Sequence, residues 1–365
     1  MKEITFLLGS LSGGGAERVC VNLANGIVNN GKRKVNLLVL NGGDEAYKNK
    51  LDEKILFYSL NITNARYAFF PLVNYLKLNK PETILVFSYE LTVLLILAKI
   101  IYRLNYKIIA RNINTLSQNL SEKGSFWRRK FVIPIVKKLY GKADYYINQC
   151  HDMQIDLIKN FPGVANKSCV INNPISDELF FKNYHNENKE DYILCVGRLE
   201  SQKSFSHAIS AFAKIHERFP SLKLVIIGKG SLENDLRAQA ASMELSEYVV
   251  FSGFQQNIEK FYLKARATIL TSVYEGFPNV ILESMALGTP VVAYDCPSGP
   301  REIIINGVNG ILVEYQNIEE LEKSILKILS EEYDPEKIRN SVLEYKCSLI
   351  IKKYEQCFFS VEQAG

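Results

Sequence analysis

The sequence predicts an α/β protein with two doubly wound domains, each a parallel sheet covered by helices on both faces. Short apolar runs rich in β-branched residues alternate with helical stretches along the whole chain. The runs are continuously apolar, which is typical of parallel strands buried on both faces. A polar, charged stretch separates two such series. Strands and helices that alternate in this way indicate repeated βαβ units.

The first series holds seven expected strands, and the second holds six. The first series comprises ITFLLGS (4–10), VNLLVL (35–40), ILFYSL (55–60), TILVFS (83–88), KIIARN (107–112), YYINQC (145–150) and SCVINN (168–173). The second comprises YILCVGR (192–198), LKLVIIGKG (222–230), VVFSGF (249–254), TILTS (268–272), PVVAYD (290–295) and GILVE (310–314).

The polar stretch at 172–192 contains a proline and then many charged residues, which indicates a domain boundary. We therefore predict an N-terminal Rossmann-like domain at 1–180 and a C-terminal one at 181–345. The tail at 346–365 is expected to form a final amphipathic helix, for which a return to the first domain is one option.

Composition narrows the class of protein. The chain has 365 residues, and its seven cysteines are scattered without any C-x-x-C pair. This pattern indicates neither a zinc site nor a disulfide framework, and it fits a reducing compartment. The N-terminus enters a strand-like run without a signal-peptide pattern. We therefore expect a cytoplasmic protein.

Charge is divided unevenly along the chain. Residues 1–180 contain 24 Lys and Arg against 14 Asp and Glu, a net +10, whereas residues 181–365 carry a net −5. A basic half beside an acidic half suggests domains with different partners. Nucleic acid, a phosphate-bearing substrate and an anionic membrane each remain possible partners of the basic half.

Two segments bear on membrane contact. The run at 91–101 is strongly apolar but has only eleven residues, too few to span a bilayer, so a buried helix is favoured. The segment at 125–142 mixes aromatic residues with Arg and Lys. Such a helix could lie on an anionic bilayer or present a solvated basic face, and both readings stay open.

A glycine run follows the first expected strand and opens a helix, within SLSGGGAERVC (10–20). Gly13, Gly14 and Gly15 would let the backbone approach a ligand closely. The start of the helix behind them suits a phosphate. The run matches neither the dinucleotide fingerprint nor a Walker loop.

Two cations follow the first strand of the second half, in VGRLESQKS (196–204). Open parallel sheets bind ligands at the carboxyl ends of their strands. Arg198 and Lys203 are therefore candidates for holding a diphosphate, although surface charges are the plainer interpretation.

Two glutamates lie eight positions apart in YEGFPNVILE (274–283). Pro278 disfavours helix at the residue before it, so a helix is expected from Asn279 to about Gly288. Glu275 would then lie in the loop and Glu283 in the helix, with a sugar near the first and a ribose near the second. Carboxylates suit both tasks because they accept hydrogen bonds from hydroxyls.

These three motifs, in this order, resemble glycosyltransferase family 4, and the similarity spans nearly the whole chain. The resemblance implies the GT-B fold, with two Rossmann-like domains facing a central cleft. It also implies retaining transfer from a nucleotide sugar. No D-x-D motif is present, so neither a metal ion nor another cofactor is expected.

The resemblance also implies roles for individual residues. Glu275 would contact the sugar or stabilise the reacting centre, Glu283 would hold the ribose, and Arg198 and Lys203 would neutralise the leaving diphosphate. Other expected donor contacts are Gly14, Gly15, Gly276, Phe277, Pro278, Asn279 and Val280. Many family members carry a histidine after the fifth strand, where this chain has Arg111 and Asn112. Arg111 and Asn112 are possible acceptor or cleft contacts, and Arg111 could contact the donor instead.

The stretch YDCPSGPREII (294–304) resembles a subgroup that builds bacterial surface polysaccharides. The similarity implies a hexose or N-acetylhexosamine moved from a UDP-sugar to an undecaprenyl-diphosphate-linked saccharide, for O-antigen, capsule or lipopolysaccharide. It also implies a location at the inner face of the cytoplasmic membrane. The alternatives are a UDP-sugar epimerase of the same fold and a non-catalytic basic binding module. A nucleic-acid partner is not expected, because no nucleic-acid-binding motif is present.

Overall fold

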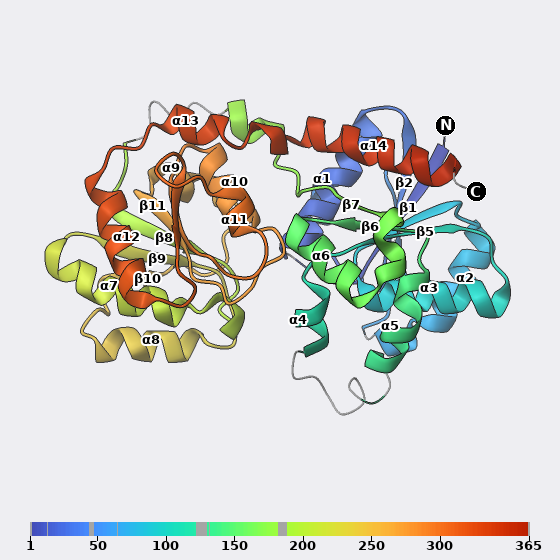
Figure 1. Ribbon diagram of the computed structural model, residues 1–365, viewed down its shortest axis with the longest axis horizontal. Helices are drawn as coiled ribbons and strands as arrows, with labels where there is room; N and C mark the ends of the chain where they lie inside the picture. Colours follow the sequence, from blue (N-terminus) through green and yellow to red (C-terminus); the bar gives the residue numbers. More distant parts are fainter. Residues whose placement is uncertain are drawn as a thin grey trace. The chain divides into compact units, whose positions relative to one another are not determined.

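The computed structural model divides into two compact units, each built on one parallel sheet (Figure 1). It describes residues 2–12, 14–43, 47–63, 65–121, 130, 132–181 and 188–363. Unit 1 comprises 1–174 with 347–365, and unit 2 comprises 175–346. Both sheets have only parallel pairings. The predicted fold class is confirmed.

Unit 1 contains a seven-stranded sheet in the order β3-β2-β1-β4-β5-β6-β7. Its strands are β1 (Lys2–Leu8), β2 (Arg33–Val39), β3 (Leu56–Ser59), β4 (Thr83–Val86), β5 (Lys107–Arg111), β6 (Tyr145–Asn148) and β7 (Ser168–Val170). Its helices are α1 (Gly15–Asn29), α2 (Phe69–Asn79), α3 (Tyr89–Tyr102), α4 (Leu116–Ser121), α5 (Ile133–Leu139), α6 (His151–Asn160) and α14 (Cys347–Gln363).

Both faces of this sheet are buried, as the apolar runs predict. Phe6 and Leu8 of β1 join a core with α1 and α14, whereas Leu7 between them joins a second core with α2 and α3. Side chains of a strand alternate between faces. A run without polar interruption therefore supplies both cores at once.

Unit 2 contains a six-stranded sheet in the order β10-β9-β8-β11-β12-β13. Its strands are β8 (Tyr192–Val196), β9 (Lys223–Ile227), β10 (Val249–Phe251), β11 (Ala267–Leu270), β12 (Val291–Tyr294) and β13 (Gly310–Val313). Its helices are α7 (Phe205–Arg218), α8 (Glu233–Ser242), α9 (Glu259–Lys264), α10 (Asn279–Ala286), α11 (Pro300–Ile303), α12 (Ile318–Ser330) and α13 (Pro335–Asn340).

The chain changes units at 174/175 and 346/347, whereas the sequence placed these boundaries at 180/181 and 345/346. The difference has a local cause. Ile175 forms a parallel bridge with Lys346, and the 3₁₀ turn Asp177–Phe181 packs against α10. This segment therefore belongs to unit 2, although it lies in the first half of the stretch at 172–192 that suggested the boundary.

The two segments considered for membrane contact have different outcomes. The apolar run at 91–101 lies in α3, where Leu91, Leu95 and Ile96 are buried, so the buried-helix prediction is confirmed. Residues 125–129 and 131 of the basic aromatic segment lie outside the described residues. Its described remainder includes α5, where Lys137 and Lys138 are exposed. Among the described residues, no helix has the length and apolar content that crossing a bilayer requires.

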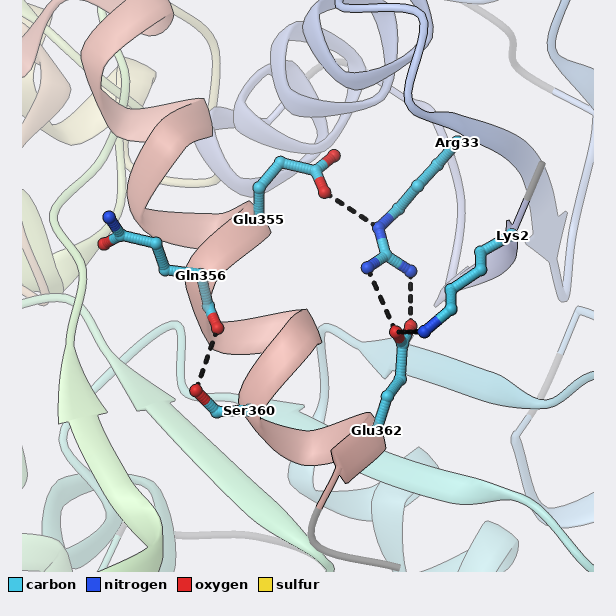
Figure 2. Close-up of polar contacts among 6 residues, drawn as sticks. All are labelled: Lys2, Arg33, Glu355, Gln356, Ser360 and Glu362. Carbon is cyan, nitrogen blue, oxygen red and sulfur yellow. Dashed lines mark hydrogen bonds and ion pairs between the residues drawn. The ribbon is translucent and has the colours of Figure 1, made fainter.

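Helix α14 is attached to the amino ends of β1 and β2 by ion pairs (Figure 2). Arg33 Nε donates to Glu355 Oε2 at 2.9 Å, and the Arg33 guanidinium also contacts Glu362. Lys2 Nζ approaches Glu362 Oε2 at 2.6 Å. The Arg33 side chain is only 5% exposed. Its charge has therefore lost most of its contact with water and is compensated by these two carboxylates. Apolar packing by Tyr354 and Phe358 completes the attachment.

We predict that Arg33→Ala destabilises unit 1 by about 2–4 kcal/mol, because it leaves two largely covered carboxylates without their main cation. The thermal midpoint of unit 1 should fall by several degrees in calorimetry. Arg237→Ala is the matched control, because its ion pair with Glu233 is half exposed and should contribute little.

The loss should also depend on pH. Burial would raise the pKa of Glu362, but hydrogen bonds from Arg33 and Lys2 outweigh it and hold the pKa below the usual 4.5. The unfolded state therefore takes up the proton first as pH falls. The stabilising contribution is present above pH 4.5 and is lost as pH falls through the folded-state pKa. A wild-type advantage over Arg33→Ala that is unchanged well below pH 4 would contradict this account.

Candidate functional site

The candidate site lies at the carboxyl ends of three neighbouring strands of unit 2. Strands β8, β11 and β12 are adjacent in the sheet and parallel. Their following loops therefore emerge at the same edge, where ligands of open α/β sheets bind. Backbone hydrogen bonds join these loops: Val273 N donates to Gln202 O at 2.8 Å, and Glu275 N donates to Pro297 O at 3.2 Å.

Glycines allow these loops to pack closely. Gly228, after β9, has a φ of 148°, and a Cβ there would lie 1.8 Å from the carbonyl oxygen of Gly197. Gly299, after β12, has a φ of 88°, and a Cβ there would lie 2.6 Å from Pro278 Cδ. Only residues without a side chain fit these two places.

Glu275 lies in the loop after β11, and its carboxylate is held from one side. Ser272 Oγ donates to Glu275 Oε1 at 2.6 Å, and Lys203 Nζ approaches the same oxygen at 2.5 Å. The side chains of Lys203 and Glu275 are 14% and 9% exposed. Hydrogen bonds between charged groups are shorter and stronger than those between neutral groups, so removing either partner would leave a covered charge uncompensated.

Arg198 lies in the loop after β8 that also carries Lys203, and its side chain is exposed. Its Nη2 donates to Gln202 Oε1 at 3.2 Å, and Gln202 Nε2 donates to the Tyr274 carbonyl oxygen at 3.0 Å. Within the described ranges, no carboxylate forms an ion pair with Arg198. Its guanidinium can therefore take an anion without losing an internal salt bridge.

Helix α10 runs from Asn279 to Ala286 after an extended Pro278. Gly288 just beyond it has a left-handed φ of 74°. The expected placement of Glu275 in the loop and Glu283 in the helix is confirmed. Glu283 is buried, and its Oε2 accepts a hydrogen bond from Tyr262 at 3.3 Å. Gly276, Phe277 and Pro278 are also buried, whereas Asn279 and Val280 are half-buried.

The other predicted glycines lie in unit 1, at the start of α1. Gly14 is the residue before the helix, and Gly15 is its exposed first residue. Gly13 lies outside the described residues. A Cβ at Gly14 would lie 2.3 Å from Glu17 Oε2, so a side chain there would displace that carboxylate.

Arg111 and Asn112, at the end of β5, have their side chains engaged inside unit 1. Arg111 is 1% exposed; its Nε donates to Tyr354 of α14 at 2.8 Å, and its Nη2 donates to Asn173 at 2.5 Å. Asn112 donates to Asn148 at 2.6 Å and accepts a hydrogen bond from Tyr140. This conformation leaves neither side chain exposed to a ligand, which does not favour the acceptor contact considered for them.

The sequence analysis missed Ser272, Gln202 and Tyr262. Ser272 and Gln202 lie within the motifs that it did identify, but nothing in their spacing shows which oxygen or amide they contact. Tyr262 lies in a different helix, α9, 21 positions before Glu283. Among the described residues, no group of three or more His, Cys, Asp or Glu side chains could hold a metal ion.

Two family models match consecutive parts of the chain. The model for glycosyltransferase family 4 matches residues 13–179, and the model for glycosyl transferases group 1 matches residues 176–344. Together these matches cover most of both sheets.

Among curated relatives, a Campylobacter jejuni N-acetylgalactosaminyltransferase named for a diphospho-undecaprenol acceptor is 34% identical over 218 residues. That alignment spans 58% of this chain and only 56% of the relative. An amylovoran biosynthesis glycosyltransferase of Erwinia amylovora is 25% identical over 97% of this chain and 99% of its own length. The crystal structure of Anabaena HepE with UDP-glucose has a TM-score of 0.78 at 20% identity, covering 99% of this chain and 100% of HepE.

We predict that Gly299→Ala disturbs the candidate site. The new methyl group would meet Pro278 Cδ and the Gly276 carbonyl oxygen, and the backbone would keep a left-handed φ. The expected cost is about 1–3 kcal/mol in the unfolding of unit 2, measured by calorimetry. Gly163→Ala is the control, because a Cβ there meets no atom within 4 Å. Equal stability of the two variants would show that the loops after β11 and β12 do not pack as described.

Proposed function

Because this chain belongs to the glycosyltransferases with a family 4 domain followed by a group 1 domain, we propose that it transfers a hexose or N-acetylhexosamine from a UDP-sugar, with retention of configuration. The acceptor proposed is a lipid-linked saccharide in the biosynthesis of a bacterial surface polysaccharide. One observation carries the proposal: a carboxylate held at the carboxyl edge of the sheet, together with an exposed arginine in a neighbouring loop that forms no ion pair among the described residues.

The roles follow from these side chains. Arg198 supplies a planar guanidinium with paired donors, which suits the oxygens of a diphosphate. Glu275 accepts a hydrogen bond from a sugar hydroxyl, and Glu283 accepts those of the ribose. The segment from Gly276 to Val280 is proposed to place backbone near the donor, and Gly14 and Gly15 remain proposed donor contacts because they allow a close approach of the backbone.

The proposed reaction is a front-face displacement. The bond between the anomeric carbon and the diphosphate oxygen breaks, and a bond from the acceptor oxygen to the same carbon forms. The acceptor hydroxyl passes its proton to the leaving phosphate oxygen. Arg198 stabilises the charge that develops on the diphosphate, the usual role of fixed cations near a leaving group. No metal ion is part of this scheme.

The relatives support the substrate classes. HepE is described with UDP-glucose, the Campylobacter enzyme is named for a diphospho-undecaprenol acceptor, and the Erwinia enzyme is named for amylovoran biosynthesis. We extend this to propose action at the inner face of the cytoplasmic membrane, where such a lipid-linked acceptor would be available. The part of 125–142 that would contact the bilayer lies mainly outside the described residues.

The direct test is incubation of purified protein with UDP-glucose, UDP-galactose, UDP-N-acetylglucosamine or UDP-N-acetylgalactosamine and a lipid extract, without added metal. We expect release of UDP and a labelled lipid product. A product that still carries UDP and needs no acceptor would instead indicate an epimerase. If none of the four UDP-sugars binds to the protein and none releases UDP, the proposal is refuted.

We predict that Arg198→Ala weakens UDP binding about 10–100-fold, the range expected for lost charge-assisted hydrogen bonds. Isothermal titration calorimetry measures this directly. Arg237→Ala is the control, because it removes an exposed arginine of the same unit that pairs with Glu233. An unchanged dissociation constant in Arg198→Ala would remove this residue from the diphosphate site.

A further inference from the structure

We propose that Ser272 is a positioning residue, which fixes the Glu275 carboxylate together with Lys203 so that only Glu275 Oε2 is available to the donor sugar. The inference rests on the proposed function and deepens it. It also assigns Lys203 to the carboxylate in this conformation, in place of the diphosphate contact expected from the sequence.

The first step of the argument is the division between the two oxygens of Glu275. Both donors, Ser272 Oγ and Lys203 Nζ, approach Oε1, at 2.6 and 2.5 Å. Among the described residues, no donor reaches Oε2. Within that part of the chain Oε2 has no partner and yet is not fully buried, so it lies at an accessible position. Oε1 is therefore saturated with donors, whereas Oε2 can still accept a hydrogen bond.

The second step is that Ser272 is itself held in place. It is 1% exposed and comes two positions after the end of β11. Both of its neighbours bond to the 3₁₀ turn Ser201–Lys203: Thr271 Oγ1 donates to Lys203 O at 2.9 Å, and Val273 N donates to Gln202 O at 2.8 Å. Ser272 and Lys203, the two donors to Glu275, therefore lie in two segments that hydrogen bonds join on both sides of Ser272.

The third step is why a hydroxyl is needed beside the lysine. The Lys203 side chain is long and rotatable, so an ammonium alone permits several orientations of the carboxylate. A short hydroxyl on an anchored backbone restricts Glu275 to one orientation. Pre-organised groups lose less free energy on binding than groups that must be ordered by the ligand. Ser272 should therefore act on binding of the sugar, not of the nucleotide.

The test compares affinities for UDP and for the UDP-sugar that wild-type protein turns over best. In Ser272→Ala we expect about 10-fold weaker binding of the UDP-sugar and less than a 2-fold change for UDP, since the variant loses one hydrogen bond to a charged group that contacts only the sugar. The Ser272→Cys side chain has a similar volume, but its thiol is a weak hydrogen-bond donor. The UDP-sugar affinity of Ser272→Cys should therefore lie between those of wild-type protein and Ser272→Ala. Both would be measured by titration calorimetry.

The matched control is Ser284→Ala, which removes an equally buried hydroxyl with bonds to Thr268 and Thr289. We expect neither affinity to change there, although the protein should be similarly destabilised.

A second experiment combines Ser272→Ala with Glu275→Gln. If Ser272 acts through the carboxylate, its effect on UDP-sugar affinity should largely disappear in that background.

Several outcomes would overturn the inference. Equal losses for UDP and UDP-sugar in Ser272→Ala would indicate a structural role only. A full effect of Ser272→Ala in the Glu275→Gln background would show that Ser272 does not act through Glu275. If Ser272→Ala does not fold, the Ser272→Cys variant decides the question. A UDP-sugar affinity of Ser272→Cys equal to that of wild-type protein would contradict the inference. Failure of wild-type protein to bind any UDP-sugar would instead contradict the proposed function itself, and the inference with it.

Discussion

The parallel arrangement of the strands is the constraint on which the rest of the structure depends. A parallel strand cannot be followed by a tight hairpin, so the chain must cross back through a helix before the next strand begins. Every loop after a strand therefore emerges at one edge of its sheet. In unit 2 this brings the segments of Arg198, Glu275 and Pro297 together, although they are far apart in sequence. The same rule buries both faces of each sheet, which explains the uninterrupted apolar strands.

This constraint also explains how much the sequence predicted. All thirteen expected strands form. A short, continuously apolar run between helical segments is typical of a parallel strand buried on both faces, so the pattern predicts these strands well. The separation of Glu275 from Glu283 was predictable as well, since Pro278 acts on the backbone locally. The chain divides into its two units six residues before the predicted boundary because Ile175 pairs with Lys346, and no local pattern reports a contact between residues so distant in sequence.

Side-chain partners were less predictable than elements. Arg111, Arg198 and Lys203 look alike in the sequence, as cations that follow parallel strands. The structure gives them different surroundings: Arg111 is buried against Tyr354 and Asn173, Lys203 is paired with Glu275, and Arg198 is exposed. The difference arises from which residues approach across the fold. For Arg111 the decisive partner is in α14, more than 240 positions away.

The buried cations show why such partners matter for function. An ionised group removed from water must regain its lost hydration from the protein. Arg33 regains it from the carboxylates of Glu355 and Glu362, and the result is a fixed attachment of α14. Glu275 regains it at one oxygen only, from Ser272 and Lys203. Glu355, beside Arg33, also uses one oxygen only, but its other oxygen, Oε1, is buried and has no partner in the part of the chain that the structure describes. The second oxygen of Glu275 is not buried in this way. Accessibility of the second oxygen therefore distinguishes Glu275, which is held in position and can still accept a hydrogen bond, from Glu355, which serves only the attachment of α14.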